Sequence, residues 1–387
     1  MLTDPTSVKP APGRICMLCP GGVEHAGGIG RWAGYMAREW TRQGLVPPLE
    51  IIDTRGFGGV SVGVRAFVAA LARLVRLRAR GELAVIHANL SADGSTLRKA
   101  VVALLARALR VPLVLHLHSG RFFRFYAKLP RPLQRAVRRL FARADRVIVL
   151  GAVWREQVAD ILGVPRAKIV VLPNAVARPA VLARPAPPDG VCHIVFLGRL
   201  FAPKGVAELM AALASPALAA RAWRATLAGD GDAAPYRQMA ARDGVAARVA
   251  FPGWLGEAQV AALLHDADLV VLPSHSENLP VAVVEAVAHR VAVVATPVGA
   301  TPELLTDGES VLFVPVGDSA ALAAALARLI DDPALRGRVA AAGHDVFLRK
   351  LDAEPAARTL AHLYTSMLRM REPDGISTAA PSRVTGV

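Results

Sequence analysis

Short apolar runs rich in Val, Ile and Leu recur along the chain and alternate with longer segments of helical pattern. Five of them precede residue 151 and four follow residue 190: RICMLC, LEIID, AVIHA, LVLHLH and RVIVL, then CHIVFLG, ATLAGD, DLVVLP and VAVVATP. Continuous apolar runs between helices are typical of parallel strands that are buried on both faces. Because the series occurs twice, the sequence predicts two α/β domains.

The segment RPAVLARPAPPDG separates the two series, and its prolines and small residues suit a linker. A chain of 387 residues also exceeds the size of one comfortable core. We predict a doubly wound, Rossmann-like N-terminal domain over 1–185, a similar C-terminal domain over 186–371 whose last helix can cross back, and a flexible tail over 372–387. In such sheets ligands bind beyond the carboxyl ends of the strands, so we expect a site in the cleft where the two domains face each other.

Positive charge is concentrated in the first half of the chain. Residues 1–180 hold 28 Lys and Arg against 10 Asp and Glu, whereas residues 181–387 hold 18 against 21. Although 53% of the residues are hydrophobic, no apolar stretch reaches the roughly 20 residues that cross a bilayer. The first residues lack the pattern of a secretory signal. We therefore expect a cytoplasmic location.

Cys16 and Cys19 form a C-x-x-C pair, a spacing that redox and zinc sites also use. They lie in a predicted strand, where residues three apart point to opposite faces of the sheet. We interpret them as buried strand residues.

A glycine-rich segment, PGGVEHAGGIGRWAG, follows the first predicted strand. Gly28, Gly30 and Ala33 match G-x-G-x-x-A, and Asp53 ends the next strand, which is the pattern of a dinucleotide-binding oxidoreductase. That fingerprint needs its first glycine directly at the strand end, whereas eight residues separate Cys19 from Gly28. A glycine-rich anion site at a helix start is the interpretation that the spacing favours.

Two charged loops follow strands of the second series. FLGRLFAPKG presents Arg199 and Lys204, a guanidinium and an ammonium that suit a diphosphate, although solvated loop charges would look the same. LAGDGD contains Asp230 and Asp232, which could hold Mg²⁺ or Mn²⁺. Its glycines favour a tight turn instead.

The segment SHSENLPVAVVEA brackets an apolar run with Glu277 and Glu285. It follows a predicted strand, and Pro280 suits the first turn of a helix. A carboxylate near a helix start is stabilised by the helix dipole, which accounts for Glu277. Glu285 lies deeper in the apolar helix and needs a partner there, and donated hydroxyl groups such as those of a ribose would serve.

The ordered set of GGIG, GRL with KG, GDG and E-x7-E resembles family 4 of the retaining, nucleotide-sugar-dependent glycosyltransferases, which have the two-domain GT-B fold. The resemblance spans residues 14–371. It implies a hexosyltransferase type of enzyme that uses a nucleoside-diphosphate sugar as donor substrate, with no cofactor and no metal. It also implies retention at the anomeric carbon, with the leaving phosphate assisting the acceptor.

The resemblance carries roles to the positions that match. Glu277 would lie against the transferred sugar and Glu285 against the ribose, while Arg199 and Lys204 would stabilise the departing diphosphate. The remaining matches are His118 near the donor sugar, Gly27 and Gly28 in the N-terminal loop, backbone groups of Asn278, Leu279 and Pro280 at the phosphates, and Asn174 near the hinge. This chain has E-N-L-P where the family usually has E-G-F-G, so we expect Asn278 to reshape the phosphate pocket.

A basic and aromatic segment, GRFFRFYAKLPRPLQRAVRRLFARADR, follows His118 directly. Phe122, Phe123, Phe125 and Tyr126 cluster at its front, and an apolar stripe that includes Leu133 and Ala136 runs along a predicted helix. The basic positions of the patch are Arg121, Arg124, Lys128, Arg135, Arg138 and Arg139. We predict peripheral docking on an anionic cytoplasmic membrane surface, with a glycan or glycolipid precursor as acceptor. Ordinary packing with solvated charges would give the same pattern, and nucleic acid is disfavoured because no known nucleic-acid module is present.

The sequence leaves two rival functions, a noncatalytic sugar-nucleotide or partner-binding protein and the nicotinamide-dependent oxidoreductase. The base, the sugar, the acceptor and the linkage are not predicted.

Overall fold

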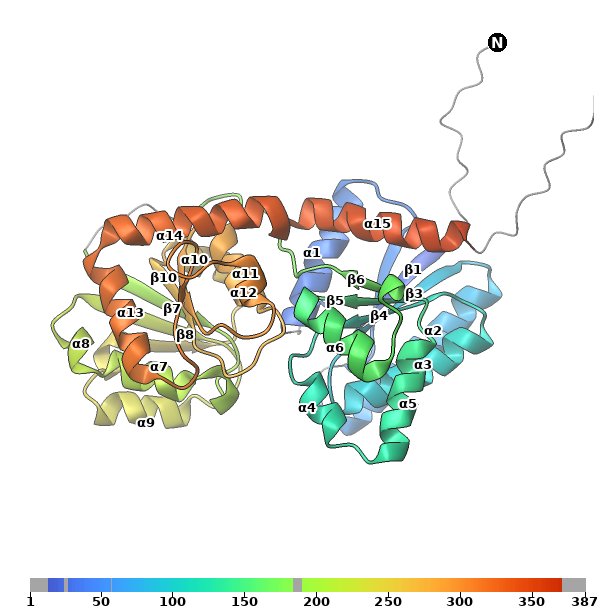
Figure 1. The fold of residues 1–387 in the computed structure, drawn as a ribbon, viewed down its shortest axis with the longest axis horizontal. Coiled ribbons are helices and arrows are strands. Elements are labelled where there is room, and N and C mark those ends of the chain that lie inside the picture. Colours follow the sequence, from blue (N-terminus) through green and yellow to red (C-terminus); the bar gives the residue numbers. More distant parts are fainter. Residues whose placement is uncertain (1–12, 24–26, 57, 184–189, 371–387) are drawn as a thin grey trace, which may run out of the picture.

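The computed structural model of the chain describes residues 13–23, 27–56, 58–183 and 190–370 (Figure 1). It contains two six-stranded, all-parallel sheets with helices packed against them. The predicted fold class, two doubly wound α/β domains, is confirmed.

The first sheet has the strand order β2-β1-β3-β4-β5-β6. Its strands are β1 (Arg14–Cys19), β2 (Leu49–Asp53), β3 (Leu83–Leu90), β4 (Leu113–Leu117), β5 (Arg146–Val149) and β6 (Ile169–Val171). Its helices are α1 (Gly28–Arg42), α2 (Val60–Ala79), α3 (Gly94–Ala108), α4 (Phe122–Ala127), α5 (Arg131–Ala142) and α6 (Ala152–Leu162).

The second sheet has the order β12-β11-β10-β7-β8-β9. Its strands are β7 (Cys192–Leu197), β8 (Trp223–Ala228), β9 (Val249–Gly253), β10 (Leu269–Leu272), β11 (Ala292–Ala295) and β12 (Leu312–Phe313). Its helices are α7 (Val206–Leu213), α8 (Pro216–Ala219), α9 (Ala234–Arg242), α10 (Glu257–His265), α11 (Val281–Ala288), α12 (Thr301–Leu304), α13 (Ser319–Asp331) and α14 (Pro333–Val346). The last helix of the chain is α15 (Ala353–Arg369).

Both sheets reverse their strand order at one point, between β1 and β3 in the first and between β7 and β10 in the second. Open α/β sheets bind ligands at such a switch point, beyond the carboxyl ends of the two strands that flank it. The glycine-rich segment follows β1, the basic loop follows β7 and the E-x7-E segment follows β10. The topology thus places three of the predicted motifs at the two switch points.

Helix α15 belongs to the second half of the chain but packs on the first domain (Figure 1). The buried carboxylate of Asp352 caps its start by accepting from the backbone N–H of Glu354 at 3.0 Å, and Arg178 donates to the same side chain at 2.6 Å. Tyr364 of α15 is fully buried with its ring centroid 5.8 Å from that of Trp40 of α1. The predicted boundary at residue 185 and the tail over 372–387 lie outside the described residues.

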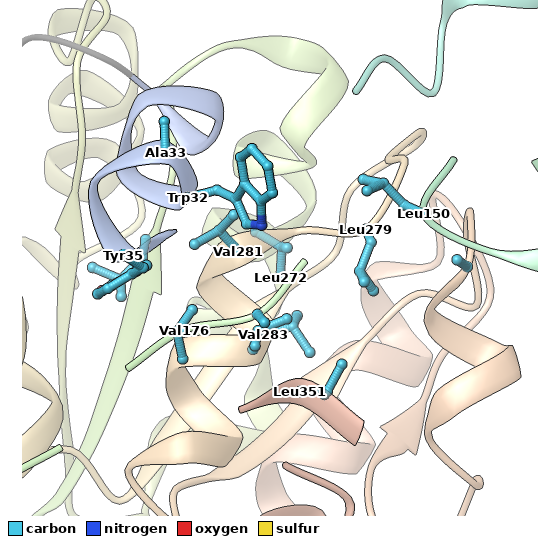
Figure 2. Packing of buried hydrophobic residues seen from close by; sticks show 14 of the residues in the cluster. Trp32, Ala33, Tyr35, Leu150, Val176, Leu272, Leu279, Val281, Val283 and Leu351 are labelled. Carbon is cyan, nitrogen blue, oxygen red and sulfur yellow. The ribbon is translucent and has the colours of Figure 1, made fainter. Parts of the chain in front are cut away.

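Apolar packing continues from one domain to the other. Figure 2 shows Trp32 and Tyr35 of α1 beside Val281 at the start of α11, with Leu279 and Val176 in the same group of buried side chains. A Cβ atom added at Gly28 would lie 3.4 Å from Val281, so the two helix starts approach closely.

Cys16 and Cys19 are both buried free thiols of β1, and burial raises the pKa of each to about 12. Their interpretation as strand residues is confirmed. No helix in the described part of the chain is both long and apolar enough to span a membrane.

Candidate active site

Glu277 lies in the loop between β10 and α11 and pairs with Lys204. Lys204 ends a 3₁₀ turn over Ala202–Lys204 beyond β7, and its Nζ is 2.5 Å from Glu277 Oε1. Their side chains are 22% and 12% exposed, so the pair is reachable from solvent. Gly205, with φ of 70°, lets this turn approach the Pro273 carbonyl, where a Cβ atom would overlap. Two predicted site residues are therefore together at the switch point of the second sheet.

Arg199 is apart from this pair. Its Nε is 3.7 Å from Asp230 Oδ2, and both side chains are more than 60% exposed. Asp232 accepts from the backbone N–H of Ala234 at 2.9 Å, and Gly229 and Gly231 have φ of 158° and 112°. The GDG segment is thus a tight turn, and no group of three or more acidic, His or Cys side chains in the described ranges is placed to hold a metal ion.

Glu285 is buried in α11, 2% exposed, and its partners come from α1 of the other domain. Arg31 Nη1 lies 3.1 and 3.0 Å from its two carboxylate oxygens, and the Tyr35 hydroxyl donates to Oε1 at 2.7 Å. Burial raises the pKa of the Glu285 carboxyl, while Arg31 and Tyr35 oppose that rise. The buried carboxylate that we expected to need a ligand hydroxyl therefore has partners within the chain.

The sequence contains a signal for this contact that we did not use. Arg31 and Tyr35 are four residues apart on a helix, so they lie on one face and can reach one acceptor together.

The E-N-L-P loop is held against the first domain. The side chain of Asn278 donates to the carbonyl of Leu117 at the end of β4 at 2.9 Å. Asn174 donates to the carbonyl of Leu279 at 2.7 Å, and a Cβ atom added at Gly120 would overlap the carbonyl of Glu277. Asn278 therefore reaches across to β4, and the pocket-shaping role predicted for it stays a prediction.

Pro280 is the N-cap residue of α11, with φ of −71°, and the helix begins at Val281. The predicted place for Pro280 in the first turn is wrong by one residue, since it precedes that turn.

The oxidoreductase pattern does not form a dinucleotide turn. Gly28, Gly30 and Ala33 are all within α1, and Gly27 is its N-cap residue with nothing within 4 Å of an added Cβ atom. Asp53 accepts from the backbone N–H groups of Gly21 at 2.8 Å and of Gly56 at 2.9 Å, so its carboxylate is held by its own loop.

His118 follows β4 and is partly buried, with its Nε2 2.9 Å from Asn89 Oδ1. Burial of the ring, and next the neighbouring His87, lower the pKa of His118 to about 3. His118 is consequently a neutral imidazole at physiological pH.

A cavity of about 570 Å³ lies between α1, β2 and the segment that leads into α10. Arg31 is part of its wall, so the cavity adjoins the Glu285 contact. Its other lining residues are Val23, Gly30, Gly34, Ala37, Arg38, Leu49, Ile51, Trp254 and Glu257.

The basic segment after His118 forms α4 and α5, and its six predicted patch residues are exposed: Arg121, Arg124, Lys128, Arg135, Arg138 and Arg139. Its aromatic residues turn inward, with Phe122 fully buried 5.4 Å from Phe141 and Phe123 stacked on Trp154. The predicted apolar stripe is also wrong in part, because Leu133 is 52% exposed and Ala136 is exposed. The aromatic residues therefore pack into the fold, and the exposed charges share the surface with Leu133 and Ala136.

Two family models match the chain. One, described as a glycosyl transferase 4-like domain, matches residues 27–175, and the other, described as glycosyl transferases group 1, matches residues 192–332. Together they account for about three quarters of the chain and divide it as the two sheets do. The chain belongs to the glycosyltransferases.

Curated relatives agree with this family. The glycosyltransferase chain is 29% identical to glycogen synthase of Mycobacterium tuberculosis over 68% of its own length and 66% of that protein. It is 28% identical to alpha-D-kanosaminyltransferase of Streptomyces kanamyceticus over 75% of its length and 79% of that enzyme. The chain thus spans slightly less than two thirds of the glycogen synthase.

Solved structures show the same GT-B fold. Sucrose-phosphate synthase from Thermosynechococcus elongatus superposes with a TM-score of 0.77 at 19% identity, covering 92% of this chain and 100% of that one. HepE from Anabaena, solved in complex with UDP-glucose, gives 0.71 at 20% identity, covering 91% and 99%. The two-domain GT-B architecture that the resemblance implied is confirmed.

Proposed function

We propose that this glycosyltransferase moves a hexose from a nucleoside-diphosphate sugar to an acceptor hydroxyl, with retention at the anomeric carbon. The observation that carries the proposal is the pair of Lys204 and Glu277. One cation and one carboxylate meet beyond the strands that flank a switch point, and both remain reachable from solvent.

In this proposal the two groups act on opposite parts of the donor. Lys204, assisted by the exposed Arg199, stabilises the negative charge that grows on the diphosphate as it leaves. Glu277 accepts hydroxyl hydrogen bonds of the sugar, and neutral His118 accepts another. The bond from the anomeric carbon to the diphosphate breaks with its electron pair on the phosphate oxygen. The acceptor oxygen then bonds to the same face, and its proton passes to the leaving phosphate.

Glu285 is the proposed ribose ligand. Its Oε1 accepts from both Arg31 and Tyr35, whereas its Oε2 accepts from Arg31 alone. A carboxylate oxygen has two acceptor positions, so Oε2 retains one for a ribose hydroxyl. Because the group is buried, α1 must move for a ribose to reach it.

For the acceptor we propose a glycan or glycolipid precursor held near an anionic membrane surface. The exposed cations of this segment support the proposal through their charge, since its aromatic side chains are buried or partly buried against the core. Sedimentation with liposomes tests it. We expect binding to anionic vesicles that is lost in high salt, and equal behaviour with neutral vesicles would contradict it.

The donor is tested first by thermal shift with UDP-, GDP- and ADP-sugars, since a bound ligand raises the melting temperature by mass action. The stabilising donor is then used in a turnover assay with EDTA present, because the proposed mechanism needs no metal. Glu277→Gln should lose most of the turnover, while Glu309→Gln, at an exposed position on another loop, should keep it.

Three results would overturn the proposal in different ways. Unchanged turnover in Glu277→Gln would remove the site. Donor binding without transfer to any acceptor would favour a noncatalytic sugar-nucleotide-binding protein. A product with inverted anomeric configuration by NMR would exclude retention.

A further inference from the structure

A polar cluster is buried in the first domain directly behind His118. His87 and Asn89 come from β3, His116 from β4 and Tyr364 from α15, and all four side chains are fully buried. The ring of Trp32 covers the cluster, with its centroid 4.7 Å from His116 and 5.2 Å from His118. Buried polar side chains are costly unless each finds a partner, so their hydrogen bonds are informative.

The hydrogen bonds of the cluster converge on one acceptor. Asn89 Oδ1 lies 2.9 Å from His118 Nε2 and 3.2 Å from His87 Nε2. In this orientation of the Asn89 amide, whose Nδ2 has no partner, the carbonyl oxygen faces both rings and can only accept, so each of these ring nitrogens carries the proton. His87 Nδ1 is then unprotonated, and it lies 2.6 Å from the Tyr364 hydroxyl, which donates to it. Burial raises the pKa of Tyr364, so the phenol keeps this proton.

The network fixes the state of His118. With its proton held on Nε2 by Asn89, the ring has Nδ1 as its one acceptor. Such an acceptor can take a hydrogen bond from a sugar hydroxyl, whereas the other tautomer would present a donor there. The loop that follows His118 packs against the backbone of Glu277 through Gly120, which places the histidine near the Glu277 loop.

We propose that Asn89 and Tyr364 are positioning residues that hold His118 in its Nε2–H tautomer. Asn89 acts directly on the histidine, and Tyr364 acts through His87, which orients the Asn89 carbonyl. Helix α15, which crosses back from the second half of the chain, thereby helps to fix the tautomer of His118. This inference rests on the proposed function for its effect on turnover, but not for the tautomer.

The ionisable groups around the His118 ring are few in the described residues. His87 and His116 face it from β3 and β4, and Tyr364 contacts His87 from α15. Burial also lowers the pKa of His87, to about 3, and that of His116. The cluster is therefore neutral around pH 7.

The tautomer is measured directly by NMR of the whole protein with ¹⁵N-labelled histidine, without any substrate. We expect His118 in the Nε2–H form in the wild-type protein and a mixture of both tautomers in Asn89→Leu. Tyr364→Phe should shift the population in the same direction by a smaller amount. Thr226→Val is the matched control, because Thr226 is 2.9 Å from His193 in the other sheet and its loss should leave His118 unchanged.

Kinetics supply the second readout. Asn89→Leu should lower kcat by about 2- to 10-fold, the range expected for one neutral hydrogen bond. Asn89→Asp places a carboxylate beside the ring and raises the pKa of His118. The activity of Asn89→Asp relative to wild type should then fall as the pH is lowered through that raised pKa, because protonation removes the Nδ1 acceptor.

The outcomes separate the two proposals. An Nδ1–H tautomer in the wild-type protein, or an unchanged tautomer in Asn89→Leu, would overturn the inference. A shifted tautomer in a protein that transfers no sugar would leave the positioning role standing and overturn the proposed function instead. An altered tautomer with kinetics equal to wild type would overturn the link to the reaction.

Discussion

The two carboxylates of the E-x7-E segment are eight positions apart and have opposite environments. Glu277 pairs with Lys204 of its own domain at the rim of the site, and its side chain is 12% exposed. Glu285 pairs with Arg31 and Tyr35 of the other domain and is buried. Both are acidic residues with a cationic partner, but the Glu277 pair is partly exposed within one domain, whereas the Glu285 carboxylate is buried and connects the two domains.

The two carboxylates of one sequence motif therefore serve two purposes. The Glu277–Lys204 pair is partly exposed, so solvent screens it and breaking it should cost less stability than breaking a buried pair. Removing one partner of a buried ion pair is strongly destabilising, because the remaining charge is neither paired nor solvated. The Glu285–Arg31 contact should therefore stabilise the folded protein and limit how far the two domains can separate. Matched substitutions at the two cations should therefore give opposite profiles of activity and stability.

Lys204→Met tests the partly exposed Lys204–Glu277 pair and should have the largest effect of these substitutions. If Lys204 stabilises the leaving diphosphate, its removal should lower kcat by about 10³-fold, the upper range for losing one group that stabilises transition-state charge. The midpoint of urea-induced unfolding should change little. Steady-state kinetics and urea titration measure both, with Lys350→Met, at an exposed position of another segment, as the control. A large loss of stability with normal kcat would reverse our assignment of the pair.

Arg31→Met tests the buried contact between Arg31 and Glu285. We expect the free energy of unfolding to fall by about 2 to 3 kcal/mol at pH 8, somewhat less than for a fully buried pair because Arg31 is partly exposed. Burial already raises the pKa of Glu285 in the folded protein. The stability that this group contributes is present below its ordinary pKa and is lost as the pH rises through the raised value. Removal of Arg31 raises that pKa further, so the deficit should shrink toward pH 5.

Arg38→Met provides a control on the same helix. Arg38 pairs with Glu257 across the domains at 2.6 Å, but both side chains are about half exposed. Its substitution should cost less than about 1 kcal/mol and show no comparable dependence on pH. Equal effects for Arg31→Met and Arg38→Met in urea titrations at both pH values would mean that burial of Glu285 does not matter.

The central strands of both sheets and one edge strand, β2, were predictable, whereas the other three edge strands were not. Nine apolar runs correspond to strands, whereas β6, β9 and β12 were missed. All three lie at sheet edges, where one neighbour is absent and burial is incomplete. In β9, VAFPG, a proline and a glycine replace the continuous apolar pattern, because an edge strand needs neither full burial nor every ladder hydrogen bond.

The proximity of Lys204 and Glu277 was predictable, because the two residues follow neighbouring strands of one sheet. Lys204 and Glu277 follow β7 and β10, so topology alone brings them together. The partners of Glu285 could not be predicted in this way, because the contact of α1 with α11 depends on how two separate domains pack. The same limit applies to Tyr364, since α15 reaches His87 only by crossing between the domains.

Tyr35→Phe tests how much a single hydrogen bond to the buried Glu285 carboxylate contributes to stability. The substitution removes only the hydroxyl that donates to Glu285 Oε1 at 2.7 Å, and the aromatic ring can still lie under Arg38. We expect a loss of about 1.5 kcal/mol in unfolding free energy, the lower end of the range for a hydrogen bond to a charged group. Because the phenol stabilises the ionised carboxylate, this loss should also shrink toward pH 5. Urea titration of Tyr35→Phe, Arg31→Met and the double variant measures the coupling, and Tyr126→Phe in α4 is the control. The two losses should not add, because both act on one carboxylate. Simple additivity would show that Tyr35 contributes through packing and not through Glu285.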